Sequence, residues 1–164
     1  METLQVSVLT PENLLSAWQG HRRLTRRVID AFPEEALFTH SIGGMRPFSD
    51  MVFEMIGITN GIGGVATGQW PASIHFFEAG DPRKPATKAA LLALWDQMTE
   101  LLEATWPSIS PERFQETDLS FGMYKGQIWW LLLYFIDNEI HHRGQAYVYL
   151  RSLGIEPPAF WDRQ

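Results

Sequence analysis

The stretch that decides the fold runs from Ile136 to Gln145 and reads IDNEIHHRGQ. It places two histidines, two acids, an asparagine and an arginine in a run that otherwise has the character of a buried helix. An apolar block at 129–135 precedes it, and a second one at 146–150 follows. Polar groups on such a helix must be paired, must bind something or must destabilise the fold. The sequence therefore predicts a polar site on a buried helix.

The helical period divides the polar residues of this stretch between two faces. At about 100° per residue, His142 and Asn138 fall on one apolar stripe and are expected to face the interior. Glu139 and Gln145 flank that stripe. The stripe itself is formed by Leu131, Phe135, Ala146, Tyr149 and Leu153.

The opposite side of the same helix is also apolar. It carries Trp129, Leu133, Ile136, Ile140 and Tyr147. A helix that is apolar all round is buried all round. In so small a chain this predicts that a second subunit covers the outer face, so that the protein is a homodimer.

Four helical segments are expected along the chain, and no strand pattern of period two stands out. Thr10-Pro11-Glu12 and Thr87 are good helix starts. The first helix is expected from Thr10-Pro11 to Ala31, and the second from Pro47 or Ser49 to about Ala66. A long connection at 67–86 leads to a third helix, capped by Thr87 and closed by Trp106-Pro107, and a second one at 107–124 leads to a fourth from about Lys125 to Leu153. This pattern predicts an all-α fold, a four-helix bundle with long crossover connections, as a single domain over residues 1–164.

The composition narrows the class of protein. The 164 residues have a formal net charge of −6 and no basic run, which argues against binding to nucleic acid or an anionic membrane. There is no cysteine, no secretory signal, and no apolar run of the roughly 20 residues that span a bilayer. A cytoplasmic protein with a small-molecule substrate is expected.

His142 has two interpretations. It is either a core histidine satisfied by its neighbours or a metal ligand, because bundle cores build metal sites from side chains of several helices. Asn138 lies one turn earlier, and Glu54 is an acid within an apolar helix that either pairs with a cation such as Arg143 or points at His142. His21 is a weaker third candidate. For His141 a structural pairing with Asp137 is favoured.

Several motifs make the chain resemble the DinB family, a damage-inducible group of four-helix bundles related to thiol-dependent transferases. The specific signal is HHRGQ at 141–145 followed by YLRSLGIEPP at 149–158. Supporting matches are GMRPF at 44–48 and TGQW at 67–70. In spacing the resemblance covers nearly the whole chain, although the strong motifs lie in its last quarter.

The resemblance implies a dimeric bundle that holds nickel, zinc or iron through three histidines, one on the second helix and two on the fourth. Only His142 matches. Asn138 occupies the position of the other fourth-helix histidine, and Glu54 falls near that of the second-helix histidine. Such a mixed set makes a harder, weaker site than three imidazoles, one that suits Mg²⁺, Mn²⁺ or Fe²⁺ or holds no metal.

Two functions follow as hypotheses. In the first, a divalent metal (nickel, zinc, iron or manganese) on His142, Glu54 and Asn138 activates a low-molecular-weight thiol, and Glu139 or His141 carries a proton. In the second, the protein is a metal-free, stress-associated bundle that binds a small apolar ligand or a partner protein. Hydrolase or nuclease activity is disfavoured because the acids for two metals are missing.

Overall fold

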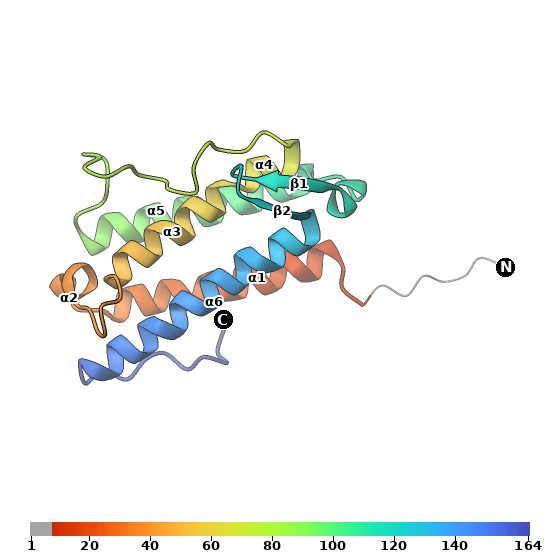
Figure 1. Cartoon of the computed structure of the whole chain (residues 1–164). Helices are drawn as coiled ribbons and strands as arrows, with labels where there is room; N and C mark the ends of the chain where they lie inside the picture. The colour runs from red at the N-terminus through yellow and green to blue at the C-terminus, as the bar shows by residue number, and fades with distance from the viewer. Residues whose placement is uncertain (1–7) are drawn as a thin grey trace.

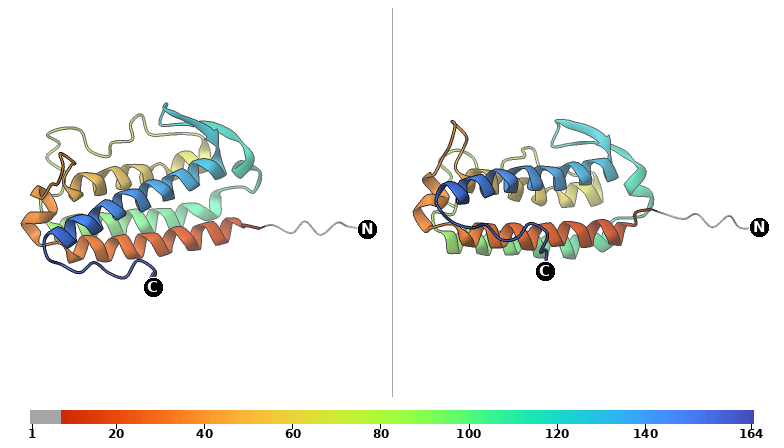
Figure 2. Two further views of the ribbon diagram at one scale, coloured as in Figure 1. Left: turned by 60° about the horizontal axis from the view of Figure 1, so that its bottom comes forward. Right: turned by 90° about the horizontal axis from the view of Figure 1, so that it is seen from below.

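Four long helices lie side by side in the computed structural model, which describes residues 8–164 (Figure 1). They are α1 (Pro11–Ala31), α3 (Phe48–Asn60), α5 (Lys88–Thr105) and α6 (Ile128–Ser152). Helix α1 packs on α5 and α6, and α3 packs on the same two helices (Figure 2). Each of α5 and α6 therefore contacts both α1 and α3. The all-α bundle expected from the sequence is confirmed.

Short elements occupy the connections. They are α2 (Glu34–Thr39), α4 (Ile62–Thr67), the 3₁₀ turns Trp106–Ser108 and Glu112–Gln115, and the strands β1 (Thr117–Ser120) and β2 (Tyr124–Gln127). The single helix expected over 47–66 is divided into α3 and α4 at Gly61. There the backbone N–H bonds to Ile58 O at 3.0 Å, and a Cβ would lie 2.4 Å from Phe121 Cζ. Because Gly61 has no side chain, the Phe121 ring can pack directly on the backbone at the point where the helix is interrupted.

The antiparallel β1–β2 hairpin corrects the expectation of an unstructured connection over 107–124 and of a fourth helix from about 125. Its register pairs Thr117 with Gln127 and Ser120 with Tyr124. Each strand has only four residues and is largely exposed, so the sequence carries little period-two pattern. The turn uses positive φ at Phe121 and Gly122.

The core has two halves along the bundle. One half surrounds Trp18, Trp106 and Phe135 near the hairpin, and the other surrounds Phe32, Trp95 and Tyr149 at the opposite end. The expected helix starts are present, since Thr10 and Asn13 form a capping box and Thr87 accepts from Ala90 N at 3.2 Å. Within residues 8–164, no helix combines the length and the apolar character that crossing a membrane requires.

One close approach positions the long connection between α4 and α5. Gly57, in the middle of α3, has no side chain, and the Ile74 carbonyl lies directly over it. A Cβ at Gly57 would lie 1.8 Å from Ile74 O. This contact holds the segment that follows Ile74 against α3.

We therefore expect Gly57→Ala to destabilise the protein by about 2–3 kcal/mol, because the new methyl group displaces a backbone segment that cannot rotate away. Gly63 in α4 is the matched control, since a Cβ there meets nothing within 4 Å. Gly63→Ala should stabilise the helix by about 0.5–1 kcal/mol. Urea denaturation measures both changes, and equal effects of the two substitutions would contradict the prediction.

Candidate functional site

Three polar side chains from α3 and α6 converge between these helices. Glu54 Oε1 lies 3.1 Å from His142 Nε2, and Asn138 Nδ2 donates to Glu54 Oε1 at 2.9 Å. Asn138 Nδ2 is also 3.4 Å from His142 Nε2. The structure thus brings together the three residues that the sequence nominated as metal ligands, here called the polar cluster.

The local sequence explains this convergence. Asn138 and His142 are one turn apart on α6, and α3 packs against that face. The cluster lies near the surface: the side chain of Glu54 is 19% exposed and that of His142 is 9% exposed. A small molecule can therefore reach it without unfolding of the core.

Neighbouring groups hold the cluster in place. Arg46 donates to Glu54 Oε2 at 2.7 Å, and Gln145 Oε1 lies 2.9 Å from His142 Nδ1. The Tyr149 hydroxyl donates to the Arg46 carbonyl at 2.8 Å. The hydrogen bond from His142 holds the pKa of the Glu54 carboxyl far below its usual range, with further contributions from Asn138 and Arg46. Glu54 is therefore an anion at neutral pH.

The cluster meets a simple geometric test for a single cation. Its three donor positions are separated by 2.9–3.4 Å. Neighbouring ligands about 2.1 Å from an ion are about 3 Å apart, so these separations suit one shared ion. Asn138 Oδ1 is buried without a hydrogen-bond partner. Because amide oxygen and nitrogen are interchangeable by rotation, that oxygen can occupy the position facing Glu54 and His142.

The donor set is nonetheless unusual for a transition metal. Within residues 8–164 no three His, Cys, Asp or Glu side chains form a metal-binding group. The third donor is the Asn138 amide, a weak neutral ligand. The set of one imidazole, one carboxylate and one amide fits a hard or borderline divalent ion rather than a soft one.

His141 is exposed beside the cluster. Its ring lies 5.2 Å from the His142 ring, centroid to centroid, at 61°. In the described part of the chain, no hydrogen bond joins His141 to Asp137, the partner that the sequence favoured. The imidazole of His141 is therefore free to face solvent at the edge of the site.

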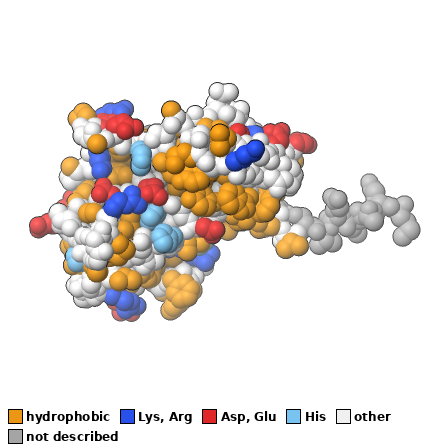
Figure 3. Space-filling model, viewed as in Figure 1, with side chains coloured by type: hydrophobic (Ala, Val, Ile, Leu, Met, Phe, Trp, Pro, Cys, Tyr) orange, Lys and Arg blue, Asp and Glu red, His pale blue; other side chains and the backbone are white. Residues whose placement is uncertain are grey.

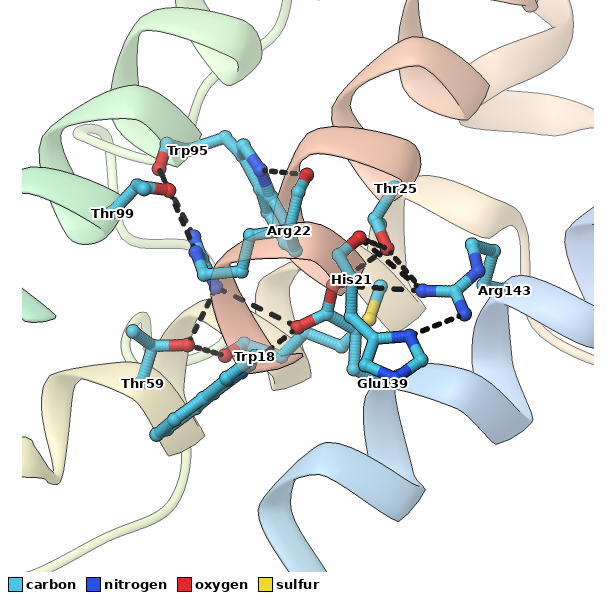
Figure 4. A network of polar contacts seen from close by, with 10 residues as sticks. Trp18, His21, Arg22, Thr25, Thr59, Trp95, Thr99, Glu139 and Arg143 are labelled. Atoms are coloured by element: carbon cyan, nitrogen blue, oxygen red, sulfur yellow. Dashed lines mark hydrogen bonds and ion pairs between the residues drawn. The ribbon is translucent and has the colours of Figure 1, made fainter. Parts of the chain in front are cut away.

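Glu139 lies in a buried network of polar contacts with residues of α1, which Figure 4 shows. Its carboxylate accepts from Trp18 Nε1 at 3.2 Å and from the Thr25 hydroxyl at 2.6 Å. Arg22 and Arg143 lie 3.9 and 3.8 Å from its two oxygens. The side chain is 2% exposed. The structure thus separates Glu139 from the cluster, although it directly follows Asn138 in sequence.

His21 belongs to the same buried network and does not approach the cluster. Arg143 Nη2 donates to His21 Nδ1 at 2.9 Å, so Nδ1 is unprotonated. Burial, followed by the positive charge of Arg143, lowers the pKa of His21 to about 4. The ring is therefore neutral at physiological pH.

A cavity of about 150 Å³ adjoins the cluster on the side of the α4–α5 connection. Its walls combine apolar rings with charged groups, and they include Arg46, Phe53, Glu54, His75, Phe77 and Lys84. Lys84 lies over the Phe53 ring, 4.6 Å from the centroid, and pairs with Asp50 at 2.9 Å. Of these residues, sequence reasoning singled out Glu54 as a site residue; Arg46 was signalled only by its place in the GMRPF motif.

The face that carries the cluster has a mixed character (Figure 3). Histidines and charged side chains gather on its left, over α3 and α6. A continuous hydrophobic area adjoins them on the right, toward the hairpin end. This face of the molecule thus combines a charged area with an apolar one.

The comparisons with known proteins agree with this architecture. A model of the DinB family matches residues 3–163. A DinB-like protein from Bacillus cereus ATCC 10987 is 17% identical with a TM-score of 0.69, covering 92% of this chain and 97% of that chain. A DinB-like protein from Bacillus subtilis is 16% identical with a TM-score of 0.68, covering 92% and 99%.

A third solved structure is that of a point mutant of a mycothiol-dependent maleylpyruvate isomerase. It is 15% identical with a TM-score of 0.60, and the match covers 82% of this chain and 60% of that one. The comparison with curated proteins found no match. At these identities the structural neighbours establish a shared fold.

The buried histidine generates a prediction about pH. The pKa of His21 is about 4 in the folded protein, against an ordinary value of 6.5. As the pH falls, the unfolded chain takes up this proton first. The stability that the neutral ring contributes is therefore complete above pH 6.5 and is lost as the pH falls toward 4.

Replacing His21 by glutamine removes this dependence. The difference in free energy of unfolding between wild type and His21→Gln should shrink by on the order of 1 kcal/mol between about pH 7 and pH 4.5. Urea denaturation at the two pH values measures it. His75→Gln, at an exposed histidine, is the control. A difference that is independent of pH would show that His21 is not held neutral.

Proposed function

Because the chain belongs to the DinB family, we propose that it is a divalent-metal-dependent enzyme of the thiol-transferase type, with its site centred on His142. One observation carries the proposal: a carboxylate oxygen, an imidazole nitrogen and a buried amide without a partner for its oxygen converge within 2.9–3.4 Å. Glu54, Asn138 and His142 would hold the ion. Manganese and iron suit this donor set better than nickel or zinc.

The metal, when bound, supplies a positive charge that lowers the pKa of a coordinated thiol. Arg46 orients Glu54 through its second oxygen, at 2.7 Å, and Gln145 fixes the ring of His142 through Nδ1, at 2.9 Å. A low-molecular-weight thiol as co-substrate is supported by the structural likeness to a mycothiol-dependent isomerase.

The exposed His141 is the residue we assign to proton transfer. Its ring is at the edge of the cluster and is not held by a hydrogen bond to Asp137, so that it can accept the thiol proton and release it to solvent. Glu139 was an equal candidate in the sequence. Its four partners in the core occupy both carboxylate oxygens, which favours His141.

A metal-free bundle that binds a small apolar ligand is the second candidate. It is favoured by the hydrogen bonds that already satisfy Glu54, which accepts from Arg46, Asn138 and His142. In that case the cluster forms the polar wall of the adjoining 150 Å³ cavity, with Phe53 and Phe77 as its apolar walls. A direct measurement of metal binding separates the two candidates.

We expect untagged, chelator-stripped protein to take up one equivalent of a divalent ion when titrated calorimetrically with Mn²⁺, Fe²⁺, Ni²⁺ and Zn²⁺. His142→Ala should abolish this uptake while the circular dichroism of the helices persists. Asn138→His should strengthen Ni²⁺ and Zn²⁺ binding about tenfold or more, because imidazole is a better ligand for these ions than an amide.

Glu156→Gln is the matched control for Glu54→Gln. Glu156 is exposed and lies beyond the end of α6, and no interaction joins it to the cluster in the described part of the chain, so its replacement should leave metal uptake unchanged, whereas Glu54→Gln should abolish it. Failure of the wild type to take up any of the four ions would reject metal dependence and leave the metal-free bundle.

We also propose that the protein is a homodimer through the outer face of α6. Trp129 and Ile140 of that face are 38% and 39% exposed, whereas Ile136 is buried in the core; Phe160 from the C-terminal segment is 64% exposed. A mostly apolar pocket of about 240 Å³ lies between Ile140, Gly144, Tyr147 and Phe160. A patch that combines a projecting ring with a pocket suits a two-fold contact, in which the same surface meets itself.

For the dimer, we expect Ile140→Asp to produce monomers, because it buries a charge without a partner in the interface. Sedimentation equilibrium at micromolar concentration measures the mass. Leu119→Asp, at a comparably exposed position of the hairpin (47%), is the control and should leave the mass unchanged. A monomeric wild type at that concentration would reject the dimer.

A further inference from the structure

An aromatic pair continues the line of the polar cluster along α6. At every fourth residue from position 130 the helix carries Trp130, Tyr134, Asn138 and His142. Residues four apart are neighbours on a helix surface, and each turn advances about 5.4 Å. The two aromatic rings therefore lead, turn by turn, to the two polar side chains of the cluster.

The hairpin braces these rings from one side. The Trp130 indole packs on the backbone of Gly126, where a Cβ would lie 2.6 Å from Trp130 Cε3. Tyr124 of β2 contacts Tyr134, with ring centroids 5.2 Å apart. Trp130 and Tyr134 stack nearly parallel, with centroids 5.9 Å apart and planes inclined by 14°. We call Tyr124, Trp130 and Tyr134 the aromatic platform.

Trp130 is the exposed ring of the platform, at 43%, whereas Tyr124 and Tyr134 are half-buried and support it. A rigid, exposed aromatic surface stacks most favourably on another flat ring, in an offset arrangement.

Glu54 of the polar cluster also acts electrostatically on Tyr134 of the platform. Burial raises the pKa of Tyr134, and a hydrogen bond with Tyr124 and the negative charge of Glu54 raise it further. Tyr134 lies four residues before Asn138 and is therefore its neighbour on the surface of α6. A ligand on the platform thus lies beside Asn138 of the polar cluster.

We propose that the aromatic platform binds a planar aromatic group of the substrate, and so places the substrate's reactive atom at the polar cluster. This inference rests on the proposed function, because it names the substrate class of the same site. A small molecule is the occupant rather than a protein, because the platform is only two stacked rings along the helix and ends at the cluster. Trp130 and Tyr134 are then residues that position the substrate and set its specificity.

The experiment compares two probes of equal size, 2-naphthol and its saturated analogue trans-decahydro-2-naphthol. Both are titrated into the whole protein and followed by saturation-transfer NMR. The flat probe should bind at least about fivefold more tightly than the saturated one, because only the flat ring stacks. Trp130→Ala should remove that preference, with about a tenfold loss of 2-naphthol affinity.

Trp129→Ala is the matched control. Trp129 is a neighbouring, comparably exposed indole (38%), but it lies off the line of the platform and donates to Gln127. Its replacement should leave 2-naphthol binding unchanged. Gly126→Ala is an independent variant that keeps the Trp130 indole but displaces it, because the new methyl group occupies the space of the ring. It should also weaken 2-naphthol binding.

The outcomes distinguish this inference from the proposed metal chemistry. His142→Ala should abolish metal uptake and leave 2-naphthol binding intact, so either result can fail alone. Equal affinity for the two probes, or an equal effect of Trp129→Ala and Trp130→Ala, would overturn the platform. So would a drop in sedimenting mass on Trp130→Ala, since it would mean that a second copy of the chain covers these rings.

Discussion

The structure depends on one buried carboxylate. Glu139 accepts hydrogen bonds from Trp18 and Thr25 of α1, and two guanidinium groups lie within 4 Å of it. Arg22 extends the connection, since it also donates to Thr59 of α3 and to Thr99 and the Trp95 carbonyl of α5. A charge out of water is costly unless it is paired and hydrogen-bonded. All four long helices must therefore assemble in one arrangement to satisfy it.

The position of the Glu139 carboxylate also sets the direction in which the polar cluster faces. Successive helical residues point about 100° apart, so fixing Glu139 toward α1 turns Asn138 toward α3. His142 follows on the same side, one turn later, and meets Glu54. The rotation of α6 about its own axis thus fixes both the polar cluster at the surface and the ionic network in the core. Substitutions in the ionic network are therefore expected to alter the rotation of α6 and so to displace Asn138 and His142 in the polar cluster.

Periodicity in the sequence was sufficient for the long helices and for the inward stripe of α6 that contains Asn138 and His142. It did not predict where the Glu139 side chain points, because that residue lies at the flank of the stripe and three of its four partners come from α1, more than a hundred residues away. The hairpin could not be predicted because strands of four residues are too short to show a clear alternation of apolar and polar residues. Arg46 was missed as a partner of Glu54 because a loop, with no period of its own, brings it there.

The contact between Gly57 and the Ile74 carbonyl has a consequence for how the site can diversify. It joins backbone to backbone, so it places few demands on the side chains that follow Ile74. His75, which is exposed and lines the cavity beside Glu54, is therefore held at a fixed position while its identity is left free, whereas Phe77 also packs on the Phe53 ring. A scaffold that anchors a variable loop in this way can exchange the wall of its pocket without disturbing the helices beneath. Diversity among chains of this fold is expected to concentrate in that loop.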